Sequence, residues 1–252
     1  MKKLSSYKPK TGYVLVLKSV KADMTAYNGF FWPKKGKCVA PDWNPIKECG
    51  NGLHGWKWGE GDASLRVESK DAKWLVLSVE ESKIIDLNGK VKFPECEVVF
   101  VGECHEAVLI IQSYAPSGNK CIFGTATAGY GGTATAGYGG TATAGDGGTS
   151  TAGDGGTSTA GDGGTATAGY GGTATAGYRG TATAGDGGAA TAGYRGTATA
   201  GSEGIIIIQY YDRQTESFKR KMAMVDGITI LPGMKYRIND NYDFEAVNET
   251  VA

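Results

Sequence analysis

Gly124-Thr-Ala-Thr-Ala-Gly-Tyr-Gly131 is an octapeptide that recurs ten times, with few changes, up to Gly204. Threonine follows the first glycine in every unit except the ninth, where Ala189 takes its place. A short fixed period indicates units that stack on one another, because one such unit cannot bury an apolar face alone. The repeats therefore decide the architecture of this chain.

Each unit divides into an alternating Thr-Ala-Thr-Ala segment and a glycine-rich segment that ends a strand and turns the chain. Alternation places both threonines on one face of the strand and both alanines on the other. Alanine should face inward, since buried hydroxyls would each need a partner. Two strands facing each other across alanine make one coil of 16 residues. Ten units then form about five coils, stacked over about 24 Å at the usual strand spacing.

Two details of the repeats test this arrangement. Ser150 and Ser158 replace inward alanines in consecutive units, so their hydroxyls should meet inside one coil and satisfy each other. The corner residues should form two rows, in which stacked tyrosines would give an aromatic ladder. The first row holds Tyr130, Asp146, Asp162, Tyr178 and Tyr194, and the second holds Tyr138, Asp154, Tyr170, Asp186 and Ser202.

The outward threonines and the tyrosines and aspartates of the corners form the candidate binding surface. Its threonines are Thr125, Thr127, Thr133, Thr135, Thr141, Thr143, Thr149, Thr151, Thr157, Thr159, Thr165, Thr167, Thr173, Thr175, Thr181, Thr183, Thr197 and Thr199. Regular Thr-x-Thr ranks on a flat sheet resemble ice-binding faces, whose hydroxyls and methyl groups can order water in a lattice-like array. Threonine also simply suits an exposed strand, so the pattern alone leaves both interpretations open.

The segment from Ala128 to Gly137, Ala-Gly-Tyr-Gly-Gly-Thr-Ala-Thr-Ala-Gly, resembles the Ala-Gly-Tyr-Gly-Ser-Thr-x-Thr-Ala repeat of bacterial ice-nucleation proteins. That resemblance covers about a third of the chain and implies a β-solenoid and activity toward ice. Two features depart from the family pattern. Glycine replaces the serine before threonine, and the Ser-Leu-Thr element of the second half-unit is missing.

The flanks predict two further folded parts. Residues 1–115 contain apolar runs at 13–20 and 74–79, an Asn88-Gly89 hairpin signal and further strands at 97–102 and 108–112, which indicate an α+β domain. Residues 116–204 form the solenoid. Residues 205–252 begin with four isoleucines, and a hairpin there should cap the open end of the solenoid, which would otherwise expose an unpaired edge. The fold class is therefore mostly β.

Cys49-Gly-Asn-Gly-Leu-His54 is the candidate site of the N-terminal domain. It is similar to a Cys-Gly-x-Gly-x-His segment in an uncharacterised domain of phage and prophage proteins. Leu53-His54-Gly55 also faintly resembles the nucleotide-binding segment of ADP-ribosyltransferases, with Glu97 or Glu106 as guesses for the catalytic acid. Zinc binding by Cys38, Cys49 and His54 fits no standard ligand spacing, and we expect buried structural thiols, no metal and no cofactor.

Composition limits the partners. The chain has 26 basic and 26 acidic residues, so it has no basic excess for binding nucleic acid. It has five cysteines, no apolar stretch behind its basic start and no run long enough to span a membrane. These features favour a cytoplasmic protein with reduced thiols, in the infected or lysogenic bacterium if the phage resemblance holds.

The sequence thus predicts a non-enzymatic solenoid that serves as a rigid structural or partner-binding module. The expected partner is a protein or a host macromolecule, and a second copy could join through the tyrosine ladder or an open sheet edge. Ice binding through the threonine ranks and an ADP-ribosyltransferase-like N-terminal domain are the alternatives.

Overall fold

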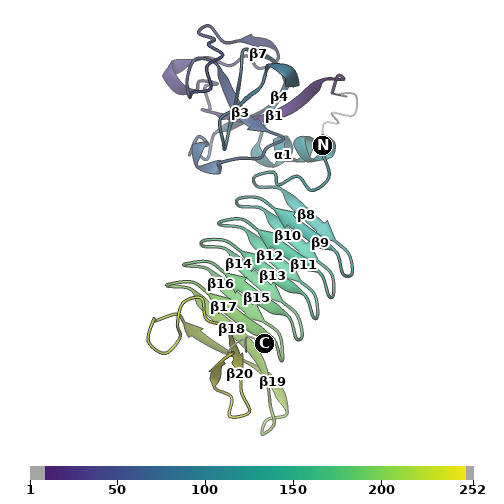
Figure 1. Cartoon of the computed structure of the whole chain (residues 1–252), viewed down its shortest axis with the longest axis vertical. Helices are drawn as coiled ribbons and strands as arrows, with labels where there is room; N and C mark the ends of the chain where they lie inside the picture. Colours follow the sequence, from purple (N-terminus) through teal and green to yellow (C-terminus); the bar gives the residue numbers. More distant parts are fainter. Residues whose placement is uncertain (1–8, 248–252) are drawn as a thin grey trace. The chain divides into compact units, whose positions relative to one another are not determined.

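The computed structural model describes residues 9–247, and the chain folds as two compact units (Figure 1). The first unit ends at Ile122 and the second begins at Phe123. Within the described residues, no helix is long and apolar enough to cross a membrane.

The first unit is built on a seven-stranded antiparallel sheet in the order β2-β7-β4-β1-β3-β6-β5. Its core consists of apolar side chains from the central strands β1 and β4, with Leu15, Leu17, Leu75 and Leu77 fully buried. The elements are β1 (Tyr13–Val20), η1 (Tyr27–Gly29), β2 (Gly36–Val39), β3 (Leu53–Lys57), η2 (Ala63–Leu65), β4 (Lys73–Glu80), η3 (Glu81–Lys83), β5 (Ile85–Asp86), β6 (Val91–Phe93), β7 (Glu95–Gly102) and α1 (Cys104–Tyr114).

The strand predicted at 108–112 is wrong, because these residues belong to helix α1. The side chain of Glu103 accepts a hydrogen bond from the helix backbone, and that of Glu106 accepts one from the Glu103 N–H, which forms a capping box. Ala107, Val108 and Ile111 are buried on one face of the helix. An apolar run alone cannot distinguish strand from helix, and here the cap decides.

The repeats form a β-solenoid with 16 residues per coil and about five coils, as the sequence predicts. Strands of alternate units pair in parallel and in register, so most threonines lie beside the threonine 16 residues later. One sheet, here called the β8 sheet, contains β8 (Thr125–Ala128), β10 (Thr141–Ala144), β12 (Thr157–Ala160), β14 (Thr173–Ala176) and β16 (Ala189–Ala192). The β9 sheet contains β9 (Thr133–Ala136), β11 (Thr149–Ala152), β13 (Thr165–Ala168), β15 (Thr181–Ala184) and β17 (Thr197–Ala200).

The interior of the solenoid is lined by alanine methyl groups, as predicted. From Ala134 onward, the inward alanines of the repeat strands are at most 5% exposed, while the threonines between them face outward. Ser150 and Ser158 are fully buried, and their hydroxyl oxygens lie 2.6 Å apart. The Ser158 hydroxyl also lies within hydrogen-bonding distance of the Ser150 carbonyl and the Thr167 N–H, so this polar pair is satisfied inside an apolar core.

Removing one hydroxyl of this pair should cost more than removing both. We expect Ser158→Ala to destabilise the solenoid by about 1–3 kcal/mol, because it leaves the buried Ser150 hydroxyl without its serine partner. The double variant Ser150→Ala/Ser158→Ala restores the interior of the other coils and should cost less than Ser158→Ala alone. Urea unfolding, monitored by hydrogen exchange of β11 and β12, measures the loss of stability in both variants. A double variant less stable than Ser158→Ala would contradict this account.

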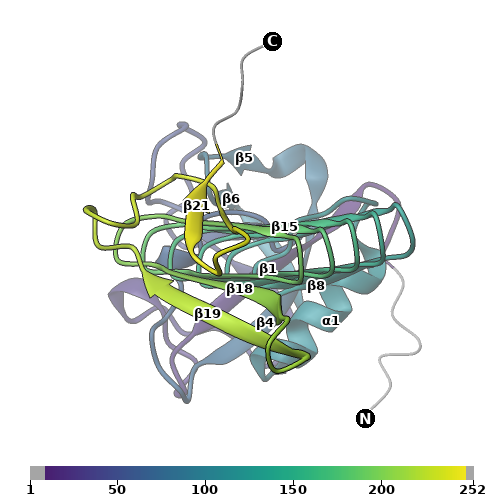
Figure 2. The ribbon, with the colours of Figure 1, turned by 90° about the horizontal axis from the view of Figure 1, so that it is seen from below.

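The second unit ends in a cap in which larger side chains replace alanine. In it, β18 (Ile205–Asp212) extends the β8 sheet and pairs with β19 (Ser217–Met224), while β20 (Tyr236–Ile238) extends the β9 sheet and pairs with β21 (Phe244–Ala246). Figure 2 looks along the solenoid and shows the two sheets as thin layers, with β19 beside one and β21 beside the other. Ile206, Ile208 and Tyr236 are buried and close the alanine core. The capping role predicted for this tail is confirmed in this respect.

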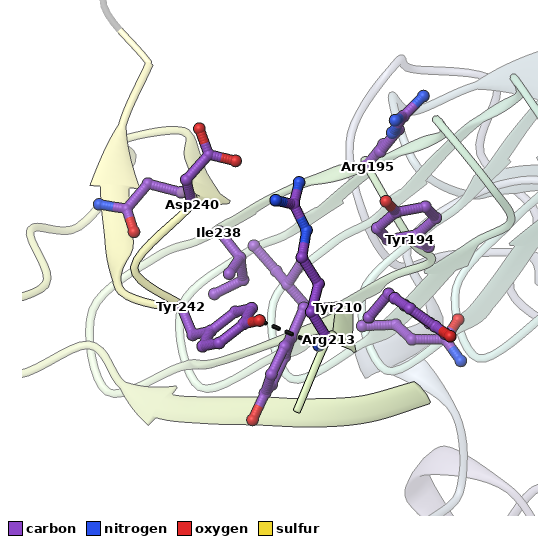
Figure 3. Close-up of a pocket in the computed structure, with 12 residues that line it drawn as sticks. Tyr194, Arg195, Tyr210, Arg213, Ile238, Asp240 and Tyr242 are labelled. Atoms are coloured by element: carbon purple, nitrogen blue, oxygen red, sulfur yellow. Dashed lines mark hydrogen bonds between the residues drawn. The ribbon is translucent and has the colours of Figure 1, made fainter. Parts of the chain in front are cut away.

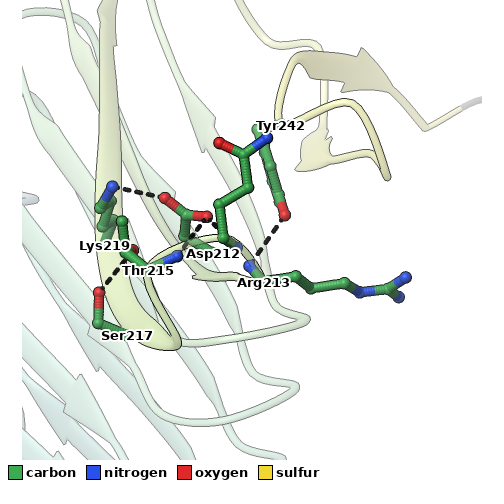
Figure 4. A network of polar contacts seen from close by, with 7 residues as sticks. Asp212, Arg213, Thr215, Ser217, Lys219 and Tyr242 are labelled. Atoms are coloured by element: carbon green, nitrogen blue, oxygen red, sulfur yellow. Dashed lines mark hydrogen bonds and ion pairs between the residues drawn. The ribbon is translucent and has the colours of Figure 1, made fainter.

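Polar contacts fix the turn between β18 and β19 (Figure 4). The Asp212 carboxylate pairs with the Lys219 ammonium at 2.5 Å and accepts the backbone N–H of Gln214 at 2.8 Å. These contacts hold the pKa of Asp212 at about 2, so the carboxylate is charged at neutral pH. The Tyr242 hydroxyl accepts the backbone N–H of Arg213 and ties the β20–β21 hairpin to this turn.

Candidate functional site

The outward side of the β9 sheet carries an uninterrupted array of threonines, here called the complete face. Five parallel strands each present two threonines in register. Neighbouring strands lie about 4.8 Å apart, and alternate residues of one strand about 7 Å apart. The hydroxyls of Thr181 and Thr197 lie 3.3 Å apart along one rank. The members of the complete face are Thr133, Thr135, Thr149, Thr151, Thr165, Thr167, Thr181, Thr183, Thr197 and Thr199.

The opposite side of the solenoid, here called the interrupted face, is less regular. Ala189 lies in register with Thr173 and removes a hydroxyl from that rank. In the next strand Ile205 and Ile207 follow at the threonine positions, and Met224 and Met222 lie opposite them on β19. The two faces therefore differ, and only the β9 sheet keeps threonine at every outward position of its five repeat strands.

The corner aspartates have a structural role that the sequence analysis missed. The Oδ1 atom of Asp146 accepts the backbone N–H of Asp162, 16 residues later, at 3.0 Å. Asp154, Asp162 and Asp186 make the same bond to the corner residue of the next coil, at 2.8–2.9 Å. Each of these carboxylates thus accepts a hydrogen bond from a corner N–H that strand pairing does not satisfy. The signal was the 16-residue spacing of the corners, which places each carboxylate beside the next corner.

The corner tyrosines do not form one continuous ladder. Tyr130 is 89% exposed, whereas the rings of Tyr178 and Tyr194 lie 6.0 Å apart. Phe218 of the cap continues this pair, with its ring 5.5 Å from that of Tyr194 and 5.3 Å from that of Tyr211. The guanidinium groups of Arg179 and Arg195 each lie over the ring of the preceding tyrosine. Aromatic side chains therefore gather at the capped end of one edge.

A small pocket of about 160 Å³ lies beside this cluster, between the last coil and the cap (Figure 3). The rings of Tyr210 and Tyr242 lie against each other at 5.0 Å, and the Arg213 side chain extends beside them. Ile238 from β20 lines the same pocket. Its volume is below the range typical of small-molecule sites, so we assign it to packing of the cap.

The N-terminal motif is split between two places. Cys49 is exposed, and its sulfur lies 2.9 Å from the Lys90 Nζ. His54 lies on β3 and lines a different pocket, together with Lys18 and Asp42. Cysteine and histidine are thus not brought together, although the sequence places them five residues apart.

Of the other cysteines, Cys38, Cys96 and Cys121 are buried and Cys104 is half-buried. Cys38 and Cys96 lie directly opposite each other on β2 and β7 and are both buried, and their contact together with burial raises the pKa of Cys96. Burial also raises the pKa of Cys121 to about 12. Among residues 9–247, no three His, Cys, Asp or Glu side chains are grouped so that they could hold a metal ion.

The acidic residues considered for an ADP-ribosyltransferase-like site lie away from His54. Glu97 is on β7, which β4 and β1 separate from the strand of His54, and it lines a pocket with Lys37 and Ser78. Glu106 belongs to the cap of α1. The acidic residue that lines the pocket of His54 is instead Asp42, which the sequence analysis did not single out.

Comparisons with known proteins find two kinds of similarity. Residues 14–111 match a family model described as a domain of unknown function, DUF7666. An ice nucleation protein from Pseudomonas fluorescens is 36% identical over 114 residues, 44% of this chain and 9% of the relative. Another, from Pantoea ananas, is 36% identical over 100 residues, 39% of this chain and 10% of the relative. One from Xanthomonas campestris pv. translucens is 31% identical over 105 residues, 41% of this chain and 7% of the relative.

The aligned stretches are somewhat longer than the repeat region, and the chain spans no more than a tenth of these three relatives. No solved structure matches the chain. The chain therefore joins an N-terminal domain that matches a family of unknown function to a β-solenoid whose repeats are similar to those of bacterial ice nucleation proteins.

Proposed function

We propose that the second unit binds ice, or water ordered as in ice, through the complete face. The observation that carries the proposal is the in-register array of ten threonines on five strands of the β9 sheet, two on each. The similarity of the repeats to those of proteins named for ice nucleation supports it.

The chemistry of threonine suits this role. Each side chain offers one hydroxyl, which donates and accepts hydrogen bonds, and one methyl group, which water must surround. Branching at Cβ limits the rotation of the side chain, so the hydroxyls keep fixed positions. Because parallel pairing in register repeats this unit along the sheet, adsorbed water meets the same surface every few ångströms. A mobile polar side chain such as lysine would not give such an array.

The size of the face indicates adsorption to existing ice rather than nucleation at mild supercooling. Five strands extend over about 20 Å at the usual spacing of strands. A critical ice nucleus becomes larger as the temperature approaches the melting point, so a short array can template only small nuclei. Each of the three relatives is about ten times as long as its aligned part or longer. This difference in length fits nucleation by the relatives and adsorption by this chain.

Ice affinity of the purified full chain tests the proposal directly. We expect the protein to concentrate in a slowly growing ice front and to hold a seed crystal at constant size over a measurable interval below its melting point. An unrelated protein of similar mass, at equal concentration, should be excluded from the ice. If the chain is excluded to the same extent and leaves crystal growth unchanged, the proposal is wrong.

The partner-binding role remains a prediction, with one feature in its favour. Phe218, Met222 and Met224 on the edge strand β19 are 58%, 65% and 62% exposed, which leaves an apolar strip beside the aromatic cluster. A second copy of the chain is the partner most easily tested, because sedimentation velocity of the full chain at increasing concentration reveals a dimer. A monomer throughout would argue against it.

A further inference from the structure

The N-terminal unit contains a pocket of about 440 Å³, which is within the range of small-molecule sites. One wall is the segment around η1, with Tyr27 and Phe30, and another is the loop that precedes β3. Lys18 of β1 and His54 of β3 also line it. This pocket is separate from the solenoid and has no part in the function proposed above.

Two buried polar atoms at this pocket have no partner. Among residues 9–247, only three buried side-chain nitrogen or oxygen atoms lack a hydrogen bond, and two of them are Trp32 Nε1 and His54 Nε2. Both residues line the pocket, and Trp32 is 2% exposed. An unpaired buried polar group is destabilising, so two in one pocket need an explanation. Both nitrogens are closed to solvent, so a ligand that displaces the side chains covering them and accepts their hydrogen bonds would supply it.

The charges around the pocket favour an anion. Burial together with the nearby Lys90 lowers the pKa of Lys18 to about 8. Burial and the nearness of Lys90, Lys18 and Lys92 lower the pKa of His54 to about 4, so the imidazole is neutral at pH 7. The opposing charge near His54 comes from Asp42. Three ammonium groups against one carboxylate leave a net positive charge.

The loop before β3, which forms one wall of the pocket, is held in place by the buried Lys92 side chain. Lys92 is 1% exposed, and its ammonium donates to the carbonyls of Glu48 at 2.8 Å and Gly50 at 3.3 Å. Gly52 has a φ of +153° and lies so close to the Trp43 ring that a Cβ atom would come within 3.0 Å of it. A side chain at position 52 would therefore press against Trp43, which is the physical reason for Gly52. The wall is therefore built before any ligand arrives, which reduces the entropic cost of binding.

We propose that this pocket binds a small organic anion that carries a ring. Its carboxylate or phosphate oxygens accept hydrogen bonds from Trp32 Nε1 and from His54 in its Nε2-protonated form, beside the Lys18 ammonium. Its ring packs against Phe30, whose own ring lies edge-on to Trp32 at 5.6 Å. Binding satisfies both unpaired nitrogens and neutralises Lys18.

The test uses the full chain and four probes: phenyl phosphate, benzoate, inorganic phosphate and uncharged benzyl alcohol. The indole N–H signals in a ¹H–¹⁵N correlation spectrum are the readout, with the Trp32 signal assigned by its loss in Trp32→Phe. We expect phenyl phosphate or benzoate to shift the Trp32 signal in a saturable way, inorganic phosphate to bind more weakly and benzyl alcohol to leave it unchanged. Which of the two ring anions binds more tightly distinguishes a phosphate ligand from a carboxylate.

Variants separate binding from folding. Lys18→Met keeps the length of the side chain and should weaken the better ring anion at least about tenfold, as expected for loss of a charged hydrogen-bond donor worth about 1.5–3 kcal/mol. His54→Gln should weaken it as well. The controls are His105→Gln, since His105 is the only other histidine, and Lys70→Met, at an exposed lysine. No shift with either ring anion, or equal affinity in Lys18→Met and wild type with unchanged thermal unfolding, overturns the proposal.

Discussion

Leucine in place of Ala174 is expected to unfold the coils around β14, whereas leucine in place of the adjacent Thr175 should leave the solenoid folded. Ala174 is fully buried in the alanine core, and Thr175 faces outward on the same strand. Leucine adds three carbon atoms to a space that the opposite strands already fill with methyl groups. Extra atoms in a packed core typically cost about 1–3 kcal/mol, because side chains or backbone must move.

The loss of stability in Ala174→Leu should reach or exceed the upper end of that range, because this core cannot rearrange to make room. Its side chains are single methyl groups without rotamers, and each strand is hydrogen-bonded in register to a strand on either side. Circular dichroism during thermal unfolding and hydrogen exchange of β12, β14 and β16 measure the effect. Equal stability of the two leucine variants would mean that the interior can hold a larger side chain, which would contradict a core tightly packed with alanine methyl groups.

The repeat pattern made most of the second unit predictable, because strict alternation over ten copies leaves one consistent arrangement. Even the contact between Ser150 and Ser158 follows from the phase of the repeat. Helix α1 was not predictable in the same way. Its Val108-Leu-Ile-Ile run satisfies the composition of a strand, and only the Glu103 and Glu106 cap distinguishes it.

The candidate sites were less accessible from the sequence than the fold. Outward threonines could be named, because orientation follows from alternation. The choice between the two faces depends on Ala189, which replaces a threonine, and on Ile205 of the cap, which lies next to Ala189 in the same row. The pocket at His54 brings together Lys18, Trp32 and Asp42 from three separate segments. Such a grouping depends on tertiary folding and leaves no local motif, so only His54 itself could be named in advance.

Tyrosine in place of Thr167 is expected to remove most of the ice affinity, while tyrosine in place of Thr159 should leave it nearly unchanged. Thr167 lies on β13, the middle repeat strand of the complete face, and Thr159 lies on β12 of the interrupted face. Both substitutions replace a half-exposed threonine in the middle of a sheet, and both introduce a residue that suits strands, so the two variants should fold alike. They differ in which face they disturb.

The expected loss is large because an ice surface is flat and rigid. A phenol ring that projects from the centre of the complete face holds the crystal away from the neighbouring threonines, so one substitution affects many contacts together. We expect at least a tenfold fall in the fraction of protein taken into a growing ice front for Thr167→Tyr, with thermal unfolding as the check on folding. Equal loss in both variants would assign binding to both faces, and full retention in Thr167→Tyr would place any ice affinity somewhere other than the complete face.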